Sequence, residues 1–80
     1  MEAEMARHVI RAAFRSAREL EGLLALLKSH CNANEYNTYS RAIATAIDSI
    51  HHEIIDRVIS SHAELKDDIE AKIAAYGRYL

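Results

Sequence analysis

Apolar residues recur along the first part of the chain at alternating steps of three and four, the spacing of one face of an α-helix. Neighbouring apolar positions widen this face until it covers almost half of the helix circumference. Such a wide face predicts a helix over residues 3–31 that packs against at least two other helices. Its central stripe consists of Ala6, Ile10, Ala13, Ala17, Leu20, Leu24, Leu27 and Cys31.

A second apolar stripe predicts a helix over residues 33–60. Asn32 and Glu35 have the spacing of a capping box, so a tight helical hairpin is expected at this point. Ile55 and Ile59 lie off the stripe, near the opposite face, which indicates a second packing surface. The stripe itself consists of Tyr36, Tyr39, Ile43, Ile47, Ile50, Ile54 and Val58.

The last segment predicts a third helix over residues 62–78. Ser61 and Glu64 match the Ser-x-x-Glu capping box, and Gly77 suits a C-terminal cap. No glycine or proline interrupts residues 60–62, so a helix that continues from residue 33 to the end is the alternative. A straight second helix would leave everything after residue 63 without a partner within the chain. The chain therefore turns back into a three-helix bundle, or the overhang packs on a second copy.

These elements predict an all-α protein, an antiparallel helical bundle of two long or three helices in one domain over residues 1–80. We favour three helices that associate as a dimer, with coiled-coil-like seams, over a dimer of long hairpins. A chain of this length buries little more than ~60% of its unfolded surface, so a partner chain or very efficient packing is needed. The single cysteine, Cys31, excludes an internal disulfide.

Charge and hydropathy narrow the environment that we expect. The formal net charge is -2, which provides no general attraction to nucleic acid or to an anionic membrane. The longest apolar run is Leu23 to Leu27, far too short to cross a bilayer. We therefore expect a cytoplasmic protein that does not bind membranes.

A stripe of basic side chains about 80° wide follows the first helix. One interpretation is a surface that binds the phosphates of nucleic acid or another polyanion. The other, which we favour, is a solvated face with local ion pairs. The hairpin register then places Arg18 near Asp48, and Arg11 near Asp56. The stripe consists of Arg7, Arg11, Arg15 and Arg18.

A cluster of carboxylates and imidazoles on the second helix has the residue types of a metal site. Side chains one helical turn apart can share a zinc ion. The cluster points almost opposite to the apolar stripe, so we expect it to face solvent, and metal binding is only a third hypothesis. No cofactor is expected. The cluster consists of Asp48, His51, His52 and Asp56.

No glycine-rich phosphate loop, zinc-finger spacing or nucleophile elbow occurs in the chain. The sequence therefore favours a small self-associating helical module for protein–protein interaction, an adaptor or regulator without catalysis. A homodimer is the expected assembly, a further protein partner fits this function, and a nucleic-acid-associated regulator is the alternative. The surface expected to carry the interaction consists of Phe14, Ile55, Ile59, Leu65, Ile69, Ile73 and Tyr76.

Overall fold

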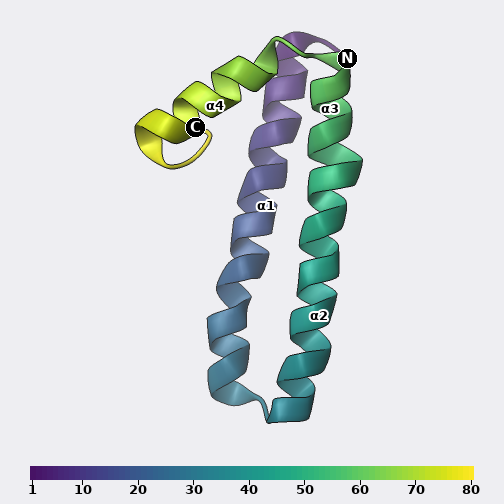
Figure 1. The fold of residues 1–80 in the computed structure, drawn as a ribbon, viewed down its shortest axis with the longest axis vertical. Helices are drawn as coiled ribbons and strands as arrows, with labels where there is room; N and C mark the ends of the chain where they lie inside the picture. Colours follow the sequence, from purple (N-terminus) through teal and green to yellow (C-terminus); the bar gives the residue numbers. More distant parts are fainter.

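Three helical rods form the protein, in a computed structural model that describes residues 1–80 (Figure 1). The first rod is α1 (Ala3–His30), and the second runs antiparallel beside it as α2 (Ala33–Ser49), the π-helix η1 (Ile50–Ile55) and α3 (Asp56–Ser61). The third rod, α4 (Leu65–Tyr76), leaves the end of the hairpin at which α1 begins. The chain is thus an all-α bundle of three helical rods, as the sequence predicted.

The hairpin turn is closed by the predicted capping box. The Asn32 side chain accepts a hydrogen bond from the Glu35 backbone N–H at 2.8 Å, and the Glu35 carboxylate accepts one from the Asn32 N–H at 3.0 Å. Two backbone donors at the start of α2 are thereby satisfied. The chain reverses within a few residues, so α1 and α2 lie side by side.

The π-helix explains the two isoleucines that lie off the stripe. The Asp56 N–H bonds to the carbonyl of His51, five residues earlier, so this turn contains one residue more than an α-helical turn. One extra residue rotates everything that follows by roughly 100° relative to the α-helical phase. Ile55 is consequently only 3% exposed, whereas Ile54, on the predicted stripe, is 39% exposed.

The helix breaks where the favoured three-helix arrangement placed the turn, but the predicted capping box does not form. Ser61 is the last residue of α3, and His62 leaves the helical conformation. At the start of α4 a backbone hydrogen bond takes the place of a side-chain cap, since the Leu65 N–H donates to the His62 carbonyl at 3.0 Å. Glu64 makes no capping hydrogen bond with its side chain, and α4 begins at Leu65, three residues later than expected.

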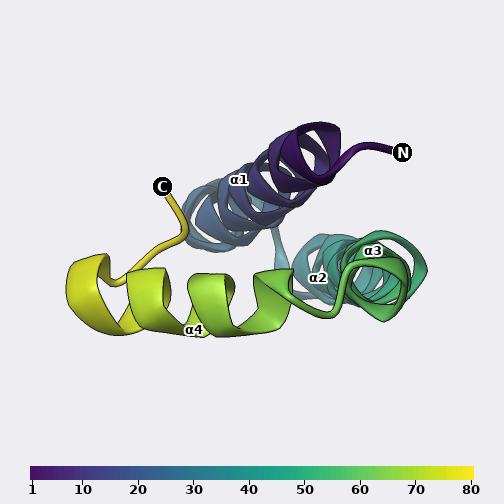
Figure 2. The same ribbon diagram turned by 90° about the horizontal axis from the view of Figure 1, so that it is seen from above.

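α4 crosses the hairpin and does not run antiparallel to the second rod (Figure 2). Its first turns cover one side of the hairpin near the N-terminus of α1, where they complete the main core. Gly77, at φ 75°, ends the helix and turns the last residues back toward α1. The core cluster consists of Ala6, Ile10, Val58, Leu65, Ile69 and Tyr79.

Packing within the chain removes three of the seven residues from the interaction surface that the sequence suggested. Ile55, Leu65 and Ile69 are buried within the chain, so they are not available to a partner. Phe14 and Ile59 are half-buried against the same core. Only two of the seven residues are exposed, namely Ile73 and Tyr76.

No helix combines the length and the apolar character that crossing a bilayer requires.

Candidate functional site

Tyr79 packs the C-terminal tail, residues 78–80, against α1. Its side chain is 7% exposed, and its hydroxyl donates a hydrogen bond to Asp68 of α4 at 2.9 Å. The ring meets Phe14 edge-on at 6.4 Å between centroids and lies 5.2 Å from the Arg11 guanidinium carbon. Lys72 lies at 5.4 Å from the ring centroid. One aromatic side chain therefore connects the tail, α4 and α1.

The same surroundings raise the pKa of the Tyr79 phenol above its ordinary value of 10.0. Burial is the main cause, because it disfavours the phenolate. The hydrogen bond to Asp68 and the negative charge of that carboxylate act in the same direction, while the charges of Arg11 and Arg7 oppose them. The folded protein thus holds the phenol proton more tightly than the unfolded chain does.

We expect an alkaline loss of stability that depends on Tyr79. Below about pH 10 the phenol is protonated in both states, and its contribution to folding is complete. As pH rises further, the unfolded chain ionises first, so the free energy of unfolding falls until the folded pKa is passed. Urea unfolding between pH 9 and 11 should show a steeper decline for the wild type than for Tyr79→Phe. Tyr39→Phe, at an exposed position, is the control, and parallel curves for wild type and Y79F would contradict the assignment.

The arginine stripe of α1 faces α4 and the tail, and not the second rod. Arg7 pairs with Asp68 at 3.8 Å, and Arg11 lies over Tyr79. The expected pairs of Arg11 with Asp56 and of Arg18 with Asp48 do not form. The register of a hairpin pairs positions along its two rods but does not fix the direction in which a stripe on one rod points.

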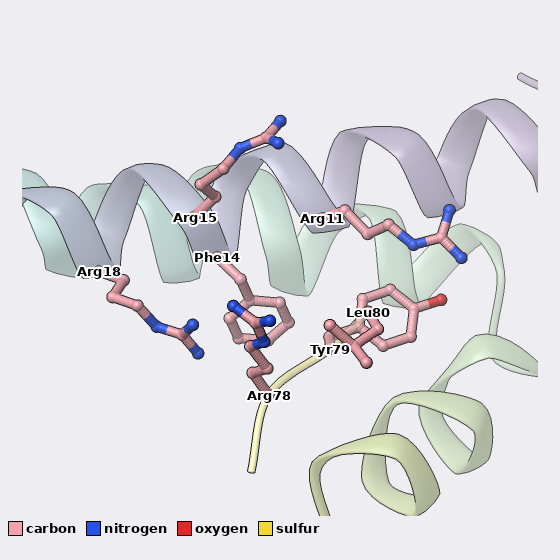
Figure 3. A pocket seen from close by; sticks show the side chains of 7 residues that line it. All are labelled: Arg11, Phe14, Arg15, Arg18, Arg78, Tyr79 and Leu80. Carbon is pink, nitrogen blue, oxygen red and sulfur yellow. The ribbon is translucent and has the colours of Figure 1, made fainter. Parts of the chain in front are cut away.

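The tail adds a further arginine to this stripe and encloses a pocket of ≈ 310 Å³ with it (Figure 3). In Figure 3 the side chains of Arg18 and Arg78 lie close to the Phe14 ring, Arg15 extends away from the ring, and Arg11 extends alongside Tyr79. The lining consists of Arg11, Phe14, Arg15, Arg18, Arg78, Tyr79 and Leu80. We call this site the arginine pocket.

Arg78 and Tyr79 were not predicted as residues of this site. A third helix folded back antiparallel to the second would place Tyr76 and Tyr79 near residues 42–45, toward the turn of the hairpin. The crossing of α4 and the turn at Gly77 bring Tyr79 to Phe14 instead. The only indication in the sequence was Gly77 itself, which predicts where the helix ends but not where the tail goes.

The four candidate metal ligands do not converge on one point. The His52 Nδ1 and the Asp56 carboxylate lie 3.2 Å apart on the surface. The His51 ring meets the Phe14 ring edge-on, with 5.9 Å between the ring centroids. His51 is therefore half-buried, whereas the sequence predicted that it faces solvent. Asp48 is exposed on the preceding turn. No group of three or more histidine, cysteine, aspartate or glutamate side chains is arranged to hold a metal ion.

The side of the hairpin opposite Phe14 carries an apolar groove of ≈ 350 Å³. No charged side chain lines it, and three of its residues are small. Met5 and Leu23 follow the same side of α1 at seven-residue steps from Ala12 and Ser16, and both are exposed. The groove is lined by Val9, Ala12, Ala13, Ser16, Ile50 and Ile54. We call this side of the hairpin the open face.

Comparison of the chain with protein-family models, with curated proteins and with solved structures gives no match.

Proposed function

We propose that the protein is a self-associating helical interaction module, an adaptor or regulator without catalysis, and that a second copy packs on the open face. The observation that carries the proposal is the apolar groove, with the exposed Met5 and Leu23 on the same side of α1, on the side of the hairpin that α4 does not cover. Apolar area of this kind is stabilising only when it is removed from water.

The total surface of the chain supports an interface of ordinary size. The monomer exposes 5758 Å² and has a radius of gyration of 14.8 Å. A compact monomer of this mass exposes about 4,900 Å² and has a radius of gyration near ~12 Å. The excess is about 900 Å², close to the ~800 Å² that each partner contributes to a standard protein interface.

The composition of the groove suits a helix of a second copy. Ala12, Ala13 and Ser16 occupy little space, so a facing helix can approach closely, while Ile50 and Ile54 form the opposite wall. No ion pair would have to be broken and no charge would be desolvated in the groove, so burial incurs little electrostatic cost. Two hairpins related by a twofold axis would then form a four-helix arrangement with α4 on the outside.

A charge placed in the groove should abolish the dimer. Sedimentation equilibrium over a wide range of concentration should give a dimer for the wild type and a monomer for Ala12→Glu. Ala12 is exposed in the single chain, so the substitution leaves the core of the monomer intact.

Ala25→Glu provides the matched control. Ala25 is also an exposed alanine of α1, but helical spacing places it on the side away from Ala12, so A25E should remain dimeric. A wild type that stays monomeric at all concentrations, or equal dissociation of A12E and A25E, would refute the proposal.

A further inference from the structure

We infer that the arginine pocket is a binding site for a phosphate group. The inference is independent of the proposed dimer, because the pocket lies on the Phe14 side of the hairpin and the groove lies on the opposite side.

The charge of the pocket is unbalanced. Four arginines contribute to its lining, but only the guanidinium groups of Arg18 and Arg78 lie beside the Phe14 ring, because Arg15 extends away from it (Figure 3). The lining contains no aspartate or glutamate side chain, and the Leu80 main-chain oxygen accepts a hydrogen bond from Lys72 at 3.4 Å. Arg11, Arg15, Arg18 and Arg78 take part in none of the salt bridges of the protein. The acid nearest to Tyr79, Asp68, already accepts the Tyr79 hydroxyl and pairs with Arg7. A bound anion would reduce the repulsion between the like charges of Arg18 and Arg78 beside Phe14.

Tertiary contacts position two of the arginines, Arg11 and Arg78. Arg11 is held over the Tyr79 ring, and its Nε is buried without a hydrogen-bond partner. Arg78 reaches α1 because the chain reverses at Gly77 and Tyr79 anchors the tail. Folding therefore already brings positive charges near one another, so this unfavourable free energy does not have to be added when a ligand binds.

The ligand class follows from the donors. Guanidinium groups present paired N–H donors that match the oxygens of a phosphate, and several of them can surround one dianion. The half-buried Phe14 ring provides an apolar floor, which lowers the local dielectric and strengthens these interactions. A volume of ≈ 310 Å³ lies at the lower end of the range of ligand pockets, about 300–1,000 Å³, and suits one small phosphorylated group.

The arginines beside Phe14 come from two elements, α1 and the tail, and not from one helix face. The pairing of Arg7 with Asp68 removes the first member of the stripe, while Arg78 adds a charge beside Arg18. A ridge along one helix would follow several phosphates of a duplex, whereas Arg18 and Arg78 beside one ring suit a single phosphate. The phosphate could belong to a small molecule or to a nucleic acid, and the experiment below separates these sources.

Pyrophosphate titrated into the full chain at low salt, followed by NMR, is the direct test. We expect saturable shifts of the backbone amides of Arg18, Arg78 and Tyr79. Arg18→Gln and Arg78→Gln should each weaken binding about tenfold or more, as expected for the loss of a charged hydrogen bond. Both positions are exposed, so the variants should fold, which their far-ultraviolet circular dichroism will verify.

Arg41→Gln is the matched control, because Arg41 is an exposed arginine of α2 outside the pocket and without a salt bridge. The affinity of R41Q for pyrophosphate should equal that of the wild type.

A second titration uses a short DNA duplex as the ligand. If the duplex binds more tightly than pyrophosphate and R18Q and R78Q weaken it while R41Q does not, the site stands and its phosphate comes from nucleic acid. The inference would be overturned if neither pyrophosphate nor the duplex shows saturable binding at low salt. It would also be overturned if R18Q, R78Q and R41Q weaken binding equally.

Discussion

Replacement of Leu65 by alanine is expected to lower the free energy of unfolding by about 3 kcal/mol. Leu65 is fully buried at the first turn of α4 and belongs to the same cluster as Ile10 and Val58. The substitution removes its packing and leaves a cavity that straight helices cannot easily close. A chain of 80 residues is stable by only about 4–12 kcal/mol in total, so the loss is a large part of the whole. Urea unfolding monitored by circular dichroism measures it.

Leu26→Ala is the control for this prediction. Leu26 is 59% exposed on α1, so its truncation should change the free energy of unfolding by no more than about 0.5 kcal/mol. L65A should also weaken the hold of α4 on the hairpin, which hydrogen exchange of the α4 amides would detect. Equal stability of L65A and L26A would mean that α4 does not pack on the hairpin as described.

The hairpin could be predicted because its determinants are local. The apolar period of α1 and the pairing of Asn32 with Glu35 depend on residues within a few positions of each other. The stop at Gly77 is of the same kind, since only the αL conformation at that residue is required. Each of these features was present in the sequence and is found in the structure.

The direction of α4 could not be predicted because it depends on side chains that are distant in sequence. Leu65 and Ile69 form its apolar face, which would suit an antiparallel or a crossed helix equally well. The crossed arrangement brings Tyr79 to Arg11 and Phe14, and it gives Asp68 both Arg7 and the Tyr79 hydroxyl as partners. The arginine pocket is therefore a consequence of tertiary packing. Of its residues, the sequence pointed only to three arginines of α1 as anion contacts and to Phe14 as part of an interaction surface.

The off-stripe isoleucines are an intermediate case. In the sequence, Ile55 and Ile59 are out of phase with the rest of the helix, and a second packing surface is one explanation of this. The structure supplies a different explanation, one additional residue in the turn between Ile50 and Ile55. A phase shift of about 100° in an otherwise regular stripe predicts a π-helix as well as a second surface.

Deletion of His52 should therefore be tolerated, because it converts the π-helix into a regular α-helical turn. His52 is exposed, and its contact with Asp56 lies on the surface, where ion pairs contribute little. Without the extra residue, Ile43, Ile55 and Val58 fall on one face of an α-helix, so the core can be kept. We expect the free energy of unfolding in urea to stay within about 1 kcal/mol of the wild type.

Deletion of Thr45 is the matched comparison, since it also removes one exposed residue of the same rod but lies before the π-helix. It should rotate the start of α2 by roughly 100° against the part that follows and turn Ile43 out of the hairpin. Loss of a buried isoleucine contact costs about 2–3 kcal/mol or more, so the variant should unfold at a clearly lower urea concentration. If both deletions destabilise equally, the phase of the second rod is not set by an extra residue at Ile50–Ile55. If only the deletion of Thr45 does so, the π-helix is the element that brings Ile55 and Val58 into the core and thereby creates the surface on which α4 packs.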